Sequence, residues 1–389
     1  MLKNTYFTSE AVSCGHPDKI CDQISDAILD EFLKQDSKSK VAVECFITNN
    51  LLVIGGEAHS HADVDVVGIA KKILTEIGYD GTNGFDPESA VFLNTLHEQS
   101  PDIRQGVDKN NEYEQGAGDQ GIMFGYASNE ISGIYMPAAI VLANRTMRVY
   151  DTLRKYGRLP GMRPDAKCQY TLKYDNNGNA TIDTIVISMQ HDENVSHQTL
   201  YDYVAHKIIP SVKEDSQLSG FFNDSYTLFV NPTGKFVIGG PQGDTGLTGR
   251  KIIVDTYGGA CPHGGGAFSG KDASKVDRSA AYMARYIAKN IVAAEIADEV
   301  TVQLSYGIGL SEPISVHVDT VNPAFKNSTI EEMIKKVFPL TPYGIIKHLS
   351  LKESNYLDTA TYGHFGRNDF TWEKVDKVKE IKSYFSIKD

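Results

Sequence analysis

Residues 263–277 read His263-Gly264-Gly265-Gly266-Ala267-Phe268-Ser269-Gly270-Lys271-Asp272-Ala273-Ser274-Lys275-Val276-Asp277. Apolar residues then recur at every third or fourth position: Val276, Ala280, Met283, Ala284, Ile287, Ile291 and Ala294. This spacing predicts a helix over 276–296. The glycines let the loop present backbone N–H groups to a ligand, and a helix N-terminus favours anions. With Lys271 and Lys275, the loop predicts a polyphosphate site where Asp277 suits Mg²⁺.

The same loop nearly matches a P-loop, since Gly265 and Gly270-Lys271 have the required spacing. Asp272 stands where a P-loop has the Ser or Thr that holds Mg²⁺, and the preceding apolar run ends well upstream, at Tyr257. A P-loop-like kinase or NTPase acting on another acceptor therefore remains the alternative function. A flexible turn before a core helix is the structural alternative.

Composition places the chain among globular proteins of two or three domains. It has 389 residues, 41% of them hydrophobic and 23% charged. A net charge of −12 without a basic tract argues against nucleic-acid binding. No apolar run reaches the ~18 residues of a membrane span, and residues 1–10 lack a signal core. The five cysteines form no C-x-x-C pair, which favours reduced thiols in a cytoplasmic protein.

A second predicted helix begins beside Pro17, after a His and before an Asp. Ile20, Ile24 and Ile28 trace one of its faces. His16 at its start could hydrogen-bond a phosphate or a leaving oxygen, and Asp18 could hold Mg²⁺. The alternative is a capped helix with a surface histidine.

One order of elements occurs three times: a long helix, a hairpin and a shorter helix. The copies span 18–34, 41–54 and 62–78, then 137–156, 169–190 and 196–212, then 275–297, 301–319 and 328–338. This order predicts an α+β fold of three similar domains with pseudo-threefold symmetry, each an antiparallel-rich mixed sheet with helices on one face. We place the domains at 1–103, 119–235 and 236–389, joined by a mobile segment at 104–118.

Three further segments have a distinctive composition: one is polar, one is rich in glycine and one is aromatic. Residues 99–118 are mostly polar or glycine, which favours a functional lid over disorder. Residues 234–270 hold 12 of the 34 glycines, a density typical of backbone that approaches a ligand; within them 252–254 is predicted as a strand. The aromatic tail from 362 to 372 favours packing over a catalytic role for His364.

Four motifs together resemble S-adenosylmethionine synthetase (methionine adenosyltransferase) of the bacterial type, and the similarity covers nearly the whole chain. The motifs are Gly15-His16-Pro17-Asp18-Lys19, Gly116-Ala117-Gly118-Asp119-Gln120-Gly121, Gly239-Gly240-Pro241 with Gly243-Asp244, and Gly264-Gly265-Gly266-Ala267-Phe268-Ser269-Gly270-Lys271-Asp272. The resemblance implies that the methionine sulfur attacks C5′ of ATP. The displaced triphosphate is then hydrolysed to pyrophosphate and phosphate. It also implies two Mg²⁺ ions per active site, one K⁺ ion per subunit, and active sites shared in a homodimer, often within a dimer of dimers.

The resemblance also implies residue roles. His16, Lys167, Arg250, Lys271 and Lys275 would be catalytic. ATP would contact His16, Asp165, Ala166, Lys167, Lys235, Phe236, Asp244, Arg250, Lys251, Ala267 and Lys271. Methionine would contact Glu57, Gln99, Asp119, Asp244 and Lys275. Asp18 and Asp277 would hold Mg²⁺, and Glu44 would hold K⁺.

Two residues depart from the family's pattern. Cys14 replaces the usual Glu before Gly15-His16, which puts in doubt any acidic role at that position. Lys235 stands where many members have Arg, so it keeps the charge but loses the bidentate fork. A non-catalytic nucleotide-binding protein that keeps the fold is a further alternative, disfavoured by the presence of every metal and phosphate candidate.

Overall fold

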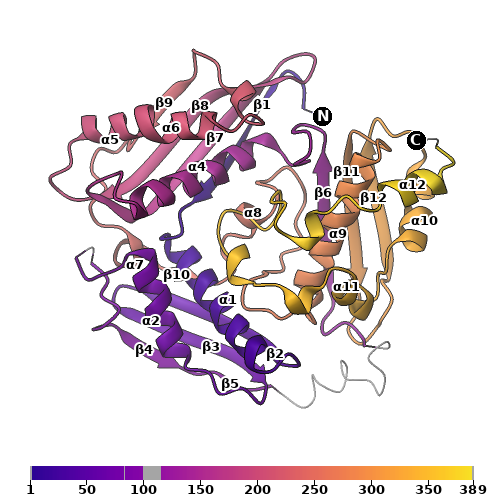
Figure 1. The fold of residues 1–389 in the computed structure, drawn as a ribbon, viewed down its shortest axis with the longest axis horizontal. Coiled ribbons are helices and arrows are strands. Elements are labelled where there is room, and N and C mark those ends of the chain that lie inside the picture. Colours follow the sequence, from indigo (N-terminus) through magenta and orange to yellow (C-terminus); the bar gives the residue numbers. More distant parts are fainter. Residues whose placement is uncertain (1, 83, 100–114, 388–389) are drawn as a thin grey trace.

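The computed structural model describes residues 2–82, 84–99 and 115–387, arranged as three sheets with helices packed between them (Figure 1). Most of the predicted lid, residues 104–114, lies outside the described residues. No helix in the described ranges is long and apolar enough to cross a membrane.

The first sheet contains the strands that follow helix α1 (Pro17–Gln35). β2 (Lys40–Thr48) and β3 (Leu51–His59) form an antiparallel hairpin, with Asn49 in the left-handed region at its turn. β4 (Val91–Asn94) and β5 (His97–Glu98) run parallel to β3. α1 packs on β2 and on α2 (Val66–Ile77). The predicted first copy of the repeat is therefore confirmed.

The second sheet follows α4 (Ala138–Lys155) and has the order β1-β7-β8-β9. Its central hairpin is β7 (Met162–Tyr174) and β8 (Ala180–His191), and β9 (Thr227–Val230) is parallel to β8. The predicted helix at 196–212 is a continuous helical run. It consists of α5 (His197–Tyr203), a π-helical turn (Val204–Ile208) and α6 (Ile209–Lys213).

The third sheet has the order β12-β11-β6 and packs on α9 (Val276–Ala293), the helix predicted after the glycine loop. β11 (Glu299–Tyr306) and β12 (Ser315–Val321) precede α10 (Asn327–Val337), which completes the third copy. α9 lies so close to β6 (Gly121–Ser128) that a Cβ on Gly125 would come within 2.0 Å of the Ala284 backbone. The chain then forms α11 (Pro342–His348) and α12 (Val378–Tyr384).

Each sheet also takes one strand from another part of the chain. β1 (Thr5–Val12) pairs with β7, β6 pairs with β11, and β10 (Gly246–Leu247) pairs with β2. The three-domain α+β architecture is confirmed, with antiparallel-rich mixed sheets. No sheet is built from one of the ranges 1–103, 119–235 or 236–389 alone, and these boundaries stay a prediction.

The predicted strand at 252–254 is wrong. Residues Ile252–Asp255 form a short helix, α8, in which the N–H of Asp255 donates to the carbonyl of Lys251 at 2.9 Å. The helical turn buries Val254 in the core of the second sheet and places the Asp255 carboxylate beside Lys19. These tertiary contacts outweigh the β-propensity of three branched residues.

Candidate active site

Four aspartates at helical spacing on α1 anchor the loops of the C-terminal half. Asp18, Asp22 and Asp26 accept hydrogen bonds from the backbone N–H groups of Leu247, Gly249 and Gly270 at 3.0, 2.9 and 2.8 Å. Asp30 accepts from the N–H groups of Tyr356 and Leu357, both at 2.8 Å. Residues four apart lie on one face of a helix. This face of α1 therefore fixes where two glycine-rich loops sit.

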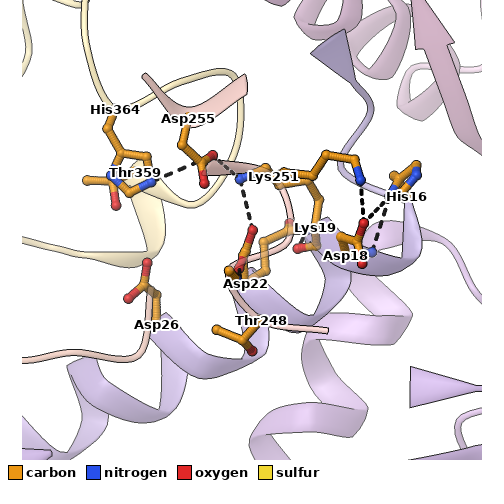
Figure 2. Close-up of polar contacts among 12 residues, drawn as sticks. His16, Asp18, Lys19, Asp22, Asp26, Thr248, Lys251, Asp255, Thr359 and His364 are labelled. Carbon is orange, nitrogen blue, oxygen red and sulfur yellow. Dashed lines mark hydrogen bonds and ion pairs between the residues drawn. The ribbon is translucent and has the colours of Figure 1, made fainter. Parts of the chain in front are cut away.

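The first group of candidate residues lies at the N-terminus of α1. His16 caps the helix, since its Nδ1 accepts from the N–H of Asp18 at 3.1 Å, but it is only 2% exposed. The cap of the alternative interpretation is therefore present, but its surface histidine is not. The Lys251 ammonium contacts Oδ2 of Asp18 (Figure 2). Nε of Arg250 lies 3.8 Å from Oδ1 of the same carboxylate.

Burial sets the protonation state of His16. Burial lowers the pKa of its imidazole well below the usual range, and the nearby Lys251 lowers it further. Because Nδ1 accepts a hydrogen bond, the neutral ring carries its proton on Nε2. His16 is therefore placed to donate from Nε2 while remaining uncharged at neutral pH.

Asp165 and Lys167 on β7 extend the first group. The N–H of Gly240 donates to Oδ2 of Asp165 at 2.9 Å, whereas Oδ1 is buried and has no hydrogen-bond partner among the described residues. Burial raises the pKa of Asp165 to about 6. Ala166 is buried and its N–H donates to Ser13 Oγ at 2.8 Å, while Lys167 is exposed. An unpartnered buried oxygen beside an exposed ammonium suits a polar ligand.

The remaining members of the first group lie on the segment after β9. The N–H of Phe236 donates to Nε2 of His191 at 3.1 Å, and Asp244 is exposed. Lys235 is 75% exposed, with its ammonium 3.7 Å from Glu193. Among the residues that the structure describes, the side chain of Lys235 is thus held only by an exposed ion pair, which contributes little.

The second group lies on the glycine loop. Nζ of Lys271 is 2.6 Å from Oδ2 of Asp277, and Nζ of Lys275 is 2.6 Å from Oδ2 of Asp272. A Cβ on Gly266 would come within 2.3 Å of Oδ1 of Asp277, so the loop needs glycine there. Half-buried lysines at a helix N-terminus, on a loop that has no room for a side chain at Gly266, fit an anionic ligand.

Residues from the first sheet border the second group. Lys271 forms an isolated bridge with Ala42, and Ala42 is in register with Glu57 on β3. The N–H of Gln99 donates to the carbonyl of Ala58 at 3.3 Å, so Gln99 follows Glu57 at the same end of the sheet. Asp119 is exposed just before β6, whose Gly121 adjoins Asp277. Glu44 is exposed on β2.

The two groups are linked through the loops. A Cβ on Gly249 would come within 2.5 Å of the Ala267 Cβ, so the glycine loop touches the residue before Arg250. The aspartates that anchor the two loops, Asp18 and Asp26, are eight residues apart on α1, which is about 12 Å along the helix axis. Within the described ranges, no ion pair joins a residue of one group to a residue of the other.

The sequence analysis did not predict a buried network of charged side chains that lies behind the first group. The Lys19 ammonium contacts Asp22 at 3.0 Å and also Asp255, and Nε2 of His364 lies 3.9 Å from Asp255 (Figure 2). Burial lowers the pKa of Lys19, but the two carboxylates more than reverse this, and the net direction is upward. The signal available in the sequence was the four-residue spacing of Asp18, Asp22, Asp26 and Asp30.

His364 belongs to the core, as the packing interpretation of the tail predicted. It is fully buried, packs edge-to-face against Phe268 and shares a 2.8 Å hydrogen bond with the Tyr282 hydroxyl. Trp372 stacks on Tyr282 at 3.9 Å between ring centroids. All five cysteines are buried and unpaired; burial raises the pKa of Cys14 to about 12, so its thiol stays neutral.

The P-loop alternative finds no support in the geometry. The segment before the loop is helix α8, not a strand, and a P-loop connects a strand to a helix. Asp272 accepts from the N–H of Val41 at 2.7 Å and of Ser274 at 2.8 Å. Asp272 therefore tethers the loop to the first sheet rather than replacing a metal-binding hydroxyl.

Comparison with known proteins agrees with this arrangement. Three family models match: the N-terminal domain of S-adenosylmethionine synthetase at residues 4–101, its central domain at 114–236 and its C-terminal domain at 238–374. A curated S-adenosylmethionine synthase of Helicobacter hepaticus (strain ATCC 51449 / 3B1) is 53% identical over 392 residues, which covers 100% of both chains. The chain therefore belongs to the S-adenosylmethionine synthetase family.

Proposed function

We propose that this chain, a methionine adenosyltransferase, makes S-adenosylmethionine from ATP and L-methionine and releases phosphate and pyrophosphate. The observation that carries the proposal is the buried neutral His16 at the start of α1, beside Asp18, Arg250 and Lys251. The glycine loop, which is anchored to the same helix through Asp26, adds two further lysines. Such a density of cations suits a triphosphate.

The reaction needs alignment and charge neutralisation rather than a covalent protein intermediate. The methionine sulfur attacks C5′ of ATP, the C5′–O bond breaks, and the triphosphate departs as sulfur becomes a sulfonium. A neutral thioether needs no general base. Holding sulfur, carbon and leaving oxygen in line contributes several kcal/mol, on the order of 7 or more. Arg250, Lys251, Lys271 and Lys275 stabilise the negative charge that develops on the leaving group.

His16 has a distinct role in this mechanism. Its Nδ1 is occupied by the N–H of Asp18, so Nε2–H is the free donor. We assign to it a hydrogen bond to the oxygen that leaves C5′, or to the adjoining phosphate. A neutral donor adds a directed hydrogen bond without competing with the lysines for the same charge. Water then cleaves the triphosphate into pyrophosphate and phosphate at the same cations.

The nucleoside and methionine roles follow from the remaining positions. Oδ1 of Asp165 is a buried acceptor without a partner among the described residues, which suits a donor on the nucleoside. Lys167, Lys235, Phe236, Asp244 and Ala267 would complete that pocket. Glu57, Gln99 and Asp119 would bind methionine, and the carboxylate of Asp119 would stabilise the sulfonium.

The donor sets of the two proposed metal positions fit Mg²⁺. Asp18 and Asp277 each direct a carboxylate oxygen at a lysine ammonium, so each already neutralises a cation. Within the described residues no three acidic, His or Cys side chains cluster as a metal site. Mg²⁺ commonly uses one or two carboxylates plus substrate phosphates. When bound, it would neutralise charge on the departing triphosphate. Glu44 is a single exposed carboxylate, which alone does not make a K⁺ site.

We propose a homodimer in which the first group of one chain meets the second group of its partner. The two groups lie along one helix without a joining ion pair, as described above. Each sheet also exposes apolar side chains on strands whose neighbouring residues face the helices. These are Val91 and Leu93 on β4, Phe229 on β9 and Ile122 on β6, 44–54% exposed. We propose that the sheet faces carrying these side chains form the contact between the two chains.

A substrate screen tests the proposed reaction. The protein is incubated with ATP, Mg²⁺, K⁺ and each amino acid in turn, and nucleotide and phosphate products are separated. We expect methionine alone to release both phosphate and pyrophosphate and to form a sulfonium product. ADP as the product, or release independent of methionine, would contradict the assignment.

A further inference from the structure

A basic cavity lies outside the proposed active site, between the C-terminal end of α1 and α11. Its volume is about 530 Å³, and it is lined by the end of α1, residues 37–40, His59 at the end of β3, α11 and the following 3-10 turn (Leu351–Glu353). Gln115 and the end of the glycine loop, residues 272–274, complete the wall. We call it the α1–α11 cavity. None of its lining residues is assigned a role in the proposed reaction.

Four lysines from three segments surround this cavity: Lys38, Lys40, Lys347 and Lys352. Within the described ranges, none of the four ammonium groups forms an ion pair. Two carboxylates lie on the cavity wall, and among the described residues one of them, that of Glu353, forms no ion pair. The other wall carboxylate, Asp272, is already paired with Lys275 at 2.6 Å. A local excess of positive charge in a chain of net charge −12 is unusual. It is an anion-binding arrangement.

The cavity has polar and apolar walls in addition to charge. Nε2 of Gln115 is buried, lines the cavity and has no hydrogen-bond partner among the described residues. It supplies a neutral donor beside the lysines. Leu33, Ile346 and Tyr343 form an apolar wall. A cavity with this volume, an apolar wall and a few converging donors has the features of a small-molecule site.

We propose that the α1–α11 cavity is a second binding site, for a polyphosphate anion. The anion is either free inorganic polyphosphate or the phosphate chain of a nucleotide whose base packs on the apolar wall. Asp272 forms part of the cavity wall and also holds Lys275 of the glycine loop. The second site therefore shares one carboxylate with the proposed active site, although its lysines are different.

Calorimetric titration of the full-length protein tests the site, with inorganic triphosphate as the probe. We expect more than one binding event per chain. Lys347→Gln with Lys352→Gln weakens one event by about tenfold or more, because charge-assisted contacts are lost. Lys251→Ala weakens the other. The matched control is Lys326→Gln with Lys335→Gln, two exposed lysines on and beside α10 away from the cavity.

Titration with ATP separates the two sources of the anion. Tighter binding of ATP than of triphosphate at the cavity assigns it to a nucleotide, and equal or weaker binding assigns it to free polyphosphate. If the first double variant unfolds, Lys38→Gln with Lys40→Gln replaces it. Wild-type binding by a folded cavity variant overturns the second site. This outcome is independent of the substrate screen, which tests the reaction alone.

Discussion

The carboxylate of Asp26 on α1 accepts two hydrogen bonds from the guanidinium of Arg278 on α9, at 2.7 and 3.1 Å, and both side chains are fully buried. The same carboxylate accepts the N–H of Gly270 at 2.8 Å. One residue of the N-terminal helix therefore fixes both the glycine loop and the helix that follows it. Arg278 also donates to the carbonyls of Phe268 and Lys271.

Replacing Asp26 should be strongly destabilising. Asp26→Asn leaves the Arg278 charge buried without its counter-ion, which costs about 3–5 kcal/mol of unfolding free energy. Urea unfolding followed by circular dichroism measures the change. Asp224→Asn, at an exposed position, is the matched control and should change stability by less than about 0.5 kcal/mol. A loss below about 1 kcal/mol for Asp26→Asn would contradict the anchoring role.

The pH dependence of the unfolding free energy should show that His364 is held neutral in the folded protein. Burial lowers the pKa of His364 well below its usual range, while the unfolded chain binds a proton near pH 6.5. Stability from this group is therefore present above the unfolded pKa and is lost as pH falls below it. The difference between wild type and His364→Gln should shrink by about 1.4 kcal/mol per pH unit below ~6.

Unfolding free energies at pH 7, 6 and 5 measure this difference. Comparing the two proteins at each pH cancels the carboxylates Asp165 and Asp30, whose pKa values burial raises to about 6 and about 7 and which act in the opposite direction. A difference that stays constant with pH would show that His364 does not titrate between the two states.

Removing either charge of the second group should stop the reaction without unfolding the protein. Lys275→Ala and Asp277→Ala are expected to lower kcat by at least about a hundredfold, the typical loss when a group that stabilises developing charge is removed. Both side chains are partly exposed, so folding should survive. Coupled phosphate release and thermal unfolding are measured together, with Lys326→Ala as the control. Retained turnover in either variant removes the assigned role.

Mixing inactive variants tests whether the active site is shared. In our proposal His16→Ala damages the first group and Lys275→Ala damages the second. A heterodimer of the two would have one site with both defects and one site with neither. Co-expression with random pairing should restore about a quarter of wild-type activity. If the co-expressed protein stays as inactive as its parents, each site is formed within one chain.

The sequence was sufficient for the elements whose cause is local. The helix after the glycine loop, the capped helix start at His16 and the hairpin at 41–54 all follow from spacing, capping and strand patterning. The threefold order of elements likewise predicted three α+β units. The strand predicted at 252–254 is wrong, because burial of Val254 and the contact of Asp255 with Lys19 stabilise the short helix α8 there.

The candidate site was predictable by residue type but not by arrangement. The sequence identified Asp18 and Lys251 separately, and their contact joins residues 233 positions apart. The ladder of aspartates on α1 was visible as a four-residue spacing, yet nothing local indicates that each carboxylate would hold a distant backbone N–H. Burial of His16, which fixes its neutral form, also depends on loops from elsewhere in the chain.

The amino-acid sequence by itself determined the secondary-structure elements, the family and the residue types of the site, because propensity, periodicity and motif chemistry act over short distances. Only the tertiary structure decided that each sheet takes a strand from another part of the chain. It also decided that α1 carries both loops, and that the lysines beyond α1 enclose a separate cavity. Those features depend on contacts between residues hundreds of positions apart, which form only when the three units pack together.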